Sequence, residues 1–235
     1  IQPIEEIAKI TREKKVIFHT DAVDSVGMVP IDVQKMGVDL LSFAANTFYG
    51  PTGVGALYIR RGTRIFPLLD GGVQEGNKRA GTENLLGIIG MGTAAAITRQ
   101  TLDKWTAHCL SLKNQLLKEL PNYIDHYLIN THAEHSLPNM VSMSVQFIEG
   151  ESVMLMLDDE DIAVSTRSAC ATGSLRASHV LISLGLSHAD AQGTLVLSFG
   201  KDNTAEEITT FLIALKNVVT TLRDISPLYQ KVSQG

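Results

Sequence analysis

The chain has 235 residues, of which 44% are hydrophobic and 19% are charged, and its formal net charge at pH 7 is -5. This composition is that of a folded protein and excludes wholesale disorder. The acidic balance, with no long basic run, gives no reason to expect direct nucleic-acid binding. Two cysteines cannot build a disulfide framework, which favours a reducing compartment, and no apolar stretch is long enough to span a bilayer.

The first hundred residues predict short strands that alternate with helices. The predicted elements are helices over 3–13 and 32–36 and strands over 16–18, 39–43 and 56–60. The first strand is predicted to be buried and to deliver Asp21 at its end. Between the last two strands lies the stretch 42–55, which is rich in Gly and Pro and predicts a rigid turn at a strand end. Active sites of α/β folds often lie at such strand ends.

A long helix is predicted from Glu83 to about Leu120, with Cys109 on its apolar face. Strands over 127–129, 140–147, 162–164 and 194–199 and helices over 151–158 and 180–184 follow. Thr204 and Glu207 form the capping-box pattern of the last helix, and Ser187 with Asp190 resembles another. The order predicts an α/β portion over residues 1–105 and an α+β domain over 106–235.

The two cysteines receive opposite interpretations. Cys170 lies in a loop of small residues with Arg167 three positions before it, which predicts an exposed thiol whose thiolate is favoured. The alternative is an inert cysteine in a tight turn, which the loop composition disfavours. Cys109 is predicted to be buried in the core. The histidines at 132, 135, 179 and 188 show no spacing typical of a metal site.

Three further candidates keep two interpretations each. Asp21 can hold a cofactor nitrogen or a metal, although spacing alone favours a cap for a helix beginning at Ala22. His19 is ambiguous in the same way. Thr82 can bind a phosphate with the amides of the following helix, or it can be the N-cap of that helix. The sequence Gly53-Val54-Gly55 leads into a strand and is not interpreted as a dinucleotide fingerprint.

Taken together, the segments resemble the cysteine desulfurases of the NifS/IscS kind, a fold-type I, class V aminotransferase family. The matching segments are FHTDAV, YGPTGVGALYIRRG, GGVQEGNKRAGTEN, LPNMVSMSV, STRSACATG and SHVLISLGL, in the family's order. The resemblance implies a partial large α/β cofactor domain, a small C-terminal α+β domain and a dimer. It also implies pyridoxal phosphate held on a lysine, and transfer of sulfur from cysteine toward iron–sulfur cluster assembly or tRNA thiolation.

By this resemblance, Asp21 pairs with the pyridinium nitrogen of the cofactor, Thr82 reaches the phosphate of the neighbouring subunit, and Cys170 carries the persulfide. Four positions depart from the family pattern. Thr47 stands at the Schiff-base lysine, and a hydroxyl cannot form an aldimine. The other departures are Ala44 for a phosphate-binding serine, Asp24 for a glutamine at the ring hydroxyl, and Val196 for the arginine of the substrate carboxylate.

The resemblance starts well inside the family pattern, so at least the opening third is expected to be absent and to be supplied by another segment or chain. We expect a homo- or hetero-oligomer, with an iron–sulfur scaffold protein as a possible partner, in the cytoplasm or mitochondrial matrix. Two functions are carried forward. One is a desulfurase-like protein of sulfur transfer with impaired catalysis, and the other is a pseudoenzyme that acts as a structural subunit. A third hypothesis keeps Cys170 as a sulfur or cluster ligand without the cofactor.

Overall fold

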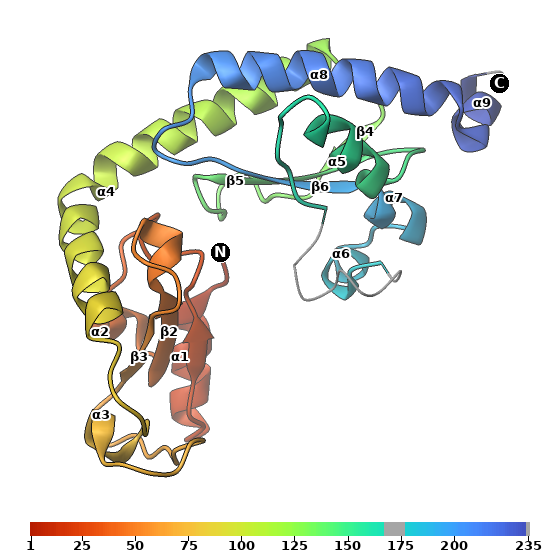
Figure 1. Cartoon of the computed structure of the whole chain (residues 1–235). Coiled ribbons are helices and arrows are strands. Elements are labelled where there is room, and N and C mark those ends of the chain that lie inside the picture. The colour runs from red at the N-terminus through yellow and green to blue at the C-terminus, as the bar shows by residue number, and fades with distance from the viewer. Residues whose placement is uncertain (167–176, 234–235) are drawn as a thin grey trace. The chain divides into compact units, whose positions relative to one another are not determined.

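A computed structural model describes residues 1–166 and 177–233 of the chain (Figure 1). The chain divides into two compact units, of which unit 1 is Ile1–Lys104 and unit 2 is Trp105–Gly235. Each unit is described by itself. The predicted Cys170 loop falls within residues 167–176 and lies outside the described part of the chain.

Unit 1 contains a three-stranded sheet with short helices and the beginning of one long helix. Its elements are α1 (Ile4–Glu13), β1 (His19–Asp21), α2 (Val33–Met36), β2 (Leu40–Ala44), the 3-10 helix η1 (Ala45–Phe48), β3 (Gly55–Ile59), α3 (Gln74–Asn77) and α4 (Leu85–Glu119). The strand order is β1-β2-β3, with β1 parallel to β2 and β2 antiparallel to β3. Apart from the strand predicted over 16–18, the predicted elements of this region are present.

Local chemistry sets the bounds of these elements. The Asp32 carboxylate accepts hydrogen bonds from the backbone N–H groups of Gln34 and Lys35, so it caps the start of α2. Gly37 ends that helix at φ +74°, a conformation that suits glycine. One strand prediction was misplaced. Val16 and Ile17 are each 56% exposed and precede β1, because among the described residues β1 pairs on one side only, with β2.

The first half of α4 packs closely on the stretch that follows β2. A Cβ at Gly90 would lie 2.5 Å from Cγ of Pro51, and a Cβ at Gly87 would lie 3.1 Å from Cβ of Val54. These glycines allow the helix backbone to approach the Gly/Pro turn. A small core of Ala45, Phe48 and Ala94 lies at the same contact.

Unit 2 contains an antiparallel sheet with its core on one face. Its elements are η2 (Leu120–Asn122), β4 (Tyr127–Ile129), β5 (Met140–Val145), α5 (Gly150–Asp158), α6 (His179–Ser183), α7 (His188–Gln192), β6 (Thr194–Ser198), α8 (Ala205–Asp224) and α9 (Pro227–Ser233). The strand order is β4-β5-β6. The alternation predicted for β5 is confirmed, because Val141, Met143 and Val145 are fully buried. The strand predicted over 162–164 is reduced to one bridge between Ser165 and Val196.

The core of unit 2 combines the second half of α4, the sheet, α5 and α8. Cys109 is fully buried there, as predicted, and burial raises the pKa of its thiol. The predicted capping box of α8 is present: the Thr204 hydroxyl accepts from the Glu207 N–H, and the Glu207 carboxylate accepts from the Thr204 N–H. Among the described residues, no helix combines the length and apolar character that crossing a membrane requires.

Candidate functional site

The carboxyl ends of β1 and β2 lie next to each other because the two strands are parallel, with Asp21 opposite Ser42. The His19 ring nitrogen Nε2 lies 3.0 Å from the Ser42 hydroxyl, which joins the two strands through side chains. His19 therefore makes a contact within the sheet, and a role at a cofactor or metal stays a prediction. The strand ends carry Asp21 and, through the chain that follows β2, Thr47.

The Asp21 carboxylate is exposed and takes part in a turn. Its Oδ1 accepts a hydrogen bond of 2.9 Å from the backbone N–H of Val23. The helix predicted to begin at Ala22 is not formed, so the capping interpretation was wrong in that respect: the carboxylate stabilises a turn over residues 22–25. Its second oxygen makes no hydrogen bond within the described part of the chain. This second oxygen is therefore able to accept a hydrogen bond from a further donor.

Thr47 lies in η1, and its hydroxyl is bonded to the backbone. Oγ1 lies 2.7 Å from the carbonyl oxygen of Val23 and 3.0 Å from that of Ala44. A hydroxyl has one proton, so it donates to one of these oxygens at a time, and the shorter distance favours Val23. Asp21 and Thr47 thus bond to the N–H and the C=O of the same residue. The structure brings these two predicted site residues together at one turn.

The backbone after Thr47 is sharply turned. Tyr49 has φ +67°, and Gly50 has no room for a side chain, since a Cβ there would lie 2.8 Å from Cβ of Ala45. These two residues fix the path between β2 and Pro51. The predicted turn is confirmed, and the side chain that it carries at position 47 is a threonine, which does not titrate near neutral pH.

Thr82 is exposed, and it is not the N-cap of the helix that follows. The carboxamide oxygen of Asn84 accepts from the Gly87 N–H at 3.1 Å, which makes Asn84 the cap of α4. The N-cap alternative for Thr82 is therefore wrong, since the helix begins two residues later than expected. Whether Thr82 contacts a phosphate stays a prediction.

In unit 2, Val196 of β6 is half-buried, and its N–H and C=O both pair with Ser165. An isopropyl side chain cannot form the ion pair with a substrate carboxylate that the family pattern requires at this position. Cys170 and Arg167 lie outside the described residues. Among the residues that the structure describes, no group of three or more His, Cys, Asp or Glu side chains gathers to hold a metal ion.

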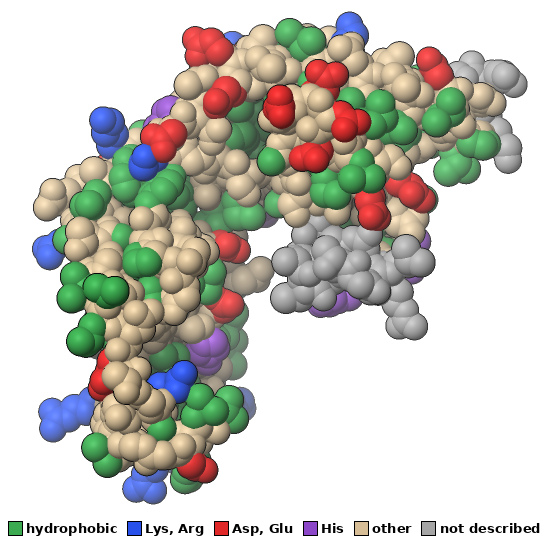
Figure 2. Space-filling view, in the orientation of Figure 1, with side chains coloured by type: hydrophobic (Ala, Val, Ile, Leu, Met, Phe, Trp, Pro, Cys, Tyr) green, Lys and Arg blue, Asp and Glu red, His purple; other side chains and the backbone are tan. Residues whose placement is uncertain are grey.

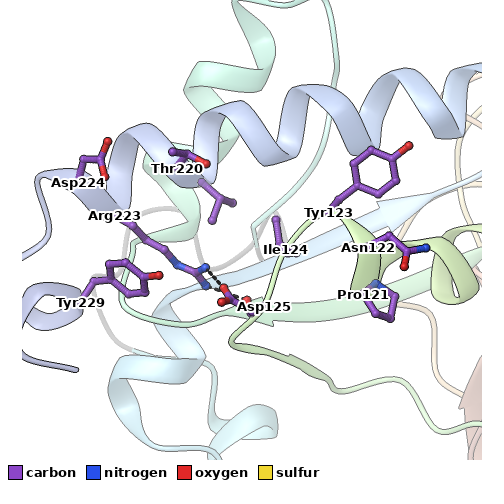
Figure 3. Close-up of a pocket in the computed structure, with 10 residues that line it drawn as sticks. Pro121, Asn122, Tyr123, Ile124, Asp125, Thr220, Arg223, Asp224 and Tyr229 are labelled. Carbon is purple, nitrogen blue, oxygen red and sulfur yellow. Dashed lines mark hydrogen bonds and ion pairs between the residues drawn. The ribbon is translucent and has the colours of Figure 1, made fainter. Parts of the chain in front are cut away.

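Unit 2 contains a buried arginine, Arg223, that the sequence analysis did not predict. Arg223 of α8 donates through Nη1 to the Asp125 carboxylate at 2.6 Å (Figure 3). Its Nη2 donates to the carbonyl oxygens of Asp125 and His126. Its guanidinium carbon lies 5.0 Å from the centre of the Tyr229 ring. It borders a cavity of about 330 Å³. Its Nη1 and Nη2 groups bond to protein partners, whereas its buried Nε has no hydrogen-bond partner among the described residues. The two Nη contacts connect α8 to the turn before β4.

The comparisons with known proteins agree with this geometry. The aminotransferase class-V family model matches residues 1–211. The chain is 45% identical over 231 residues to a cysteine desulfurase IscS of Dictyoglomus turgidum and 44% identical to one of Methanosarcina thermophila. These matches cover 98% of the chain but 59% and 57% of the relatives, so the chain spans about three fifths of their length.

Solved structures give the same result. A NifS-like protein superposes with a TM-score of 0.85 at 37% identity, and a NifS-like protein from Rickettsia africae superposes with a TM-score of 0.85 at 28% identity. Each covers 94% of this chain, which covers 58% of each. The fold is thus that of the fold-type I proteins that use pyridoxal phosphate. The chain belongs to the class-V aminotransferase family, and within it the chain is similar to the cysteine desulfurases.

Membership in this family implies pyridoxal phosphate, and the residues at the strand ends can be tested against it. Asp21 fits, because a carboxylate oxygen is available for a pyridine nitrogen. Thr47 does not fit, because it has no amine and its hydroxyl proton is donated to a backbone carbonyl. The residue set at this end of the sheet therefore does not fit a covalently held cofactor.

Proposed function

We propose that this chain is a cysteine desulfurase-like protein of sulfur transfer and iron–sulfur cluster assembly that does not itself release sulfur from cysteine. The observation that carries the proposal is Thr47 at the position of the cofactor-binding lysine, with its hydroxyl bonded to the Val23 carbonyl. Covalent attachment requires an amine, and proton transfer at the substrate carbon requires a base of suitable pKa. A threonine hydroxyl supplies neither.

Three further positions support the proposal. Ala44 ends β2 without the hydroxyl that a phosphate would bind, Asp24 is exposed, and Val196 offers no cation to a substrate carboxylate. Each change alone can be compensated by a neighbouring group. Their combination removes the attachment, the phosphate contact and the substrate clamp at once, as expected where catalysis is no longer maintained.

The direct test uses a chimaera, because the chain spans only part of its relatives. The matching segment of the Dictyoglomus turgidum relative is replaced by this chain, and sulfide release from cysteine is measured with added pyridoxal phosphate. We expect no release and no borohydride-fixed adduct at residue 47. Cofactor-dependent sulfide release by the unaltered chimaera would overturn the proposal.

The matched control puts the family's residues back at the four departing positions of the same chimaera. The substitutions are Ala44→Ser, Asp24→Gln, Thr47→Lys and Val196→Arg. We expect this variant to form the adduct at residue 47 and to recover measurable sulfide release, since the rest of the fold is retained. Without such recovery, the inactivity of the first chimaera would be due to the graft and not to Thr47, and the proposal would lose its support.

A relay role for Cys170 is compatible with this proposal. A thiolate at Cys170 would attack the outer sulfur of a donor persulfide, take that sulfur as a new Cys170 persulfide, and release the donor thiolate. Cys109 provides a control because it is fully buried, its thiol pKa is raised, and its Sγ lies 3.8 Å from the Phe199 carbonyl oxygen. With a sulfur-labelled desulfurase as donor, we expect label on the wild-type chain, retention in Cys109→Ala and loss in Cys170→Ser. Equal labelling of Cys170→Ser would contradict the relay.

The second candidate function is that of a structural subunit. Large apolar side chains are exposed at the beginning of α4 and in the loop before α3, and hydrophobic side chains are visible on the surface in Figure 2. Leu86 is 86% exposed and Phe66 is 93% exposed. Neighbouring large apolar side chains that are exposed at the start of one helix, such as Leu86 and Ile89, favour a protein contact. We propose that a second copy or a partner chain covers these side chains.

A further inference from the structure

A cavity of about 540 Å³ in unit 1 is lined by an unusual concentration of positive charge. It lies between the last turn of α1, the residues that follow this helix, and the turn after β3. Five cationic side chains line it, namely those of Arg12, Lys15, Arg60, Arg61 and Arg64. This is notable in an acidic chain, whose excess of negative charge lies in unit 2.

The lining contains one carboxylate, Asp39, and it is already engaged. Its Oδ1 lies 3.2 Å from Nε of Arg60, and its Oδ2 accepts from the Phe18 N–H at 3.0 Å. Arg60 also donates through Nε and Nη2 to the Val38 carbonyl oxygen, at 3.0 and 2.8 Å. Asp39 and Arg60 therefore form an ion pair without net charge in the lining of the cavity.

The other four cations are not neutralised by the protein. Within the described residues, the side chains of Arg12, Lys15, Arg61 and Arg64 make no hydrogen bond or ion pair. Cations near the end of α1 are favoured by the helix dipole, which accounts for Arg12 and Lys15. It does not account for Arg61 and Arg64, which come from the turn after β3.

The backbone holds these side chains near the cavity. A Cβ at Gly37 would lie 3.1 Å from Nη2 of Arg12, so glycine leaves the space that the guanidinium uses. The turn from Arg60 to Thr63 is closed by a hydrogen bond of 3.0 Å from the Thr63 N–H to the Arg60 carbonyl, with Gly62 at φ +95°. Arg61 and Arg64 therefore project from a defined turn.

We propose that this cavity binds a small oligophosphate, an anion with two or more phosphoryl groups in a row. Four unpaired cations around one cavity repel each other, and an anion of several charges relieves that repulsion. A guanidinium group binds phosphate through two parallel hydrogen bonds to its oxygens. The cavity volume lies in the range of small-molecule sites. This site is independent of the function proposed above, since it shares no residue with the ends of β1 and β2.

The test is calorimetric titration of the full chain with inorganic pyrophosphate and triphosphate at constant ionic strength. We expect one anion bound per chain, and binding weaker by at least about tenfold in Arg61→Ala/Arg64→Ala, which removes two charge-assisted contacts. The control Lys9→Ala/Arg99→Ala removes two exposed cations that do not line the cavity. It should change the affinity by less than about twofold, because distant surface charges are screened.

Equal weakening in the control variant would overturn the site, because it would show a general effect of charge. Absence of binding to either anion by the wild-type chain would do the same, as would binding to polyglutamate or single-stranded DNA alone. Arg61→Lys/Arg64→Lys keeps the charge and guards against loss of folding in the alanine variant. It should bind more weakly than the wild type and more tightly than the alanine variant, and circular dichroism checks that all variants are folded.

Discussion

At the scale of single residues, the Thr47 side chain makes a structural contact. Its hydroxyl lies 2.7 Å from the Val23 carbonyl oxygen and thereby connects η1 to the turn after β1. The same turn is held from its other side by the Asp21 carboxylate. The backbone that would surround a cofactor is therefore kept in place by hydrogen bonds within the protein.

This bond can be tested by Thr47→Val, which keeps the shape of the side chain and removes the hydroxyl. We expect a loss of about 1 kcal/mol in the free energy of unfolding, the usual contribution of such a bond. Urea denaturation measures it. Thr82→Val is the control, since the exposed Thr82 hydroxyl makes no hydrogen bond within the described residues. Equal effects of the two substitutions would contradict the structural role.

Arg223 offers a second residue-scale prediction. The side chain is only 5% exposed, and it donates to the Asp125 carboxylate and to the backbone carbonyls of Asp125 and His126. Arg223→Met keeps apolar bulk but leaves those carbonyls without their donor. We expect a loss of about 2–4 kcal/mol in the free energy of unfolding of unit 2. Lys216→Met on the exposed face of α8 should change the free energy of unfolding by less than about 0.5 kcal/mol. Denaturation curves measure both variants, and equal losses of stability would contradict the prediction.

At the scale of elements, α4 depends on glycine where it meets the turn at Pro51. Gly90→Ala places a methyl group 2.5 Å from Cγ of Pro51, whereas a Cβ at Gly92 meets no atom within 4 Å. We expect Gly90→Ala to destabilise unit 1 by about 1–3 kcal/mol because of overpacking. Gly92→Ala in the same helix should stabilise it by about 0.5–1 kcal/mol. Thermal denaturation distinguishes them, and a destabilising Gly92→Ala would contradict this packing.

The capping box of α8 predicts a pH dependence. Hydrogen bonds from the Asn203 side chain and the Thr204 N–H lower the pKa of Glu207 from its ordinary value. Because the pKa is lower in the folded state, this contribution to stability is fully present above the unfolded pKa, about 4.3. It is lost as the pH falls through the lower folded value.

Glu207→Gln isolates this contribution because a glutamine keeps an acceptor for the Thr204 N–H but does not titrate. We expect the wild type to be more stable than the variant at pH 7, with the difference shrinking as the pH falls below about 4. Urea midpoints at several pH values measure it. A difference that stayed constant with pH would mean that the charge of Glu207 plays no part in the cap.

At the scale of the whole molecule, the exposed apolar side chains predict association. Leu86 and Ile89 are 86% and 66% exposed at the beginning of α4. Light scattering after size exclusion should therefore show oligomers of the isolated chain, and Leu86→Glu/Ile89→Glu should reduce them. Leu155→Glu, at a 58% exposed position of α5, is the control. A stable, monodisperse monomer of the wild-type chain would contradict the prediction.

The sequence by itself determined most of the helices and strands and the family. Periodicity and caps predicted α1, β5 and α8, because these signals are local and lie within a few residues of each other. The resemblance located Thr47, Asp24, Ala44 and Val196 as departures, since residue identity alone decides whether an amine or a cation is present. The apolar periodicity of the long helix predicted the burial of Cys109, independently of the resemblance.

Only the tertiary structure decided which groups meet across the chain. It showed that Asp21 and Thr47 share Val23, that Arg223 is buried against Asp125, and that basic residues from α1 and from the turn after β3 line one cavity. It also corrected the strand at 16–18 and the cap at Thr82. These features depend on contacts between residues far apart in sequence, and local patterns carry no information about which distant segments the fold brings together.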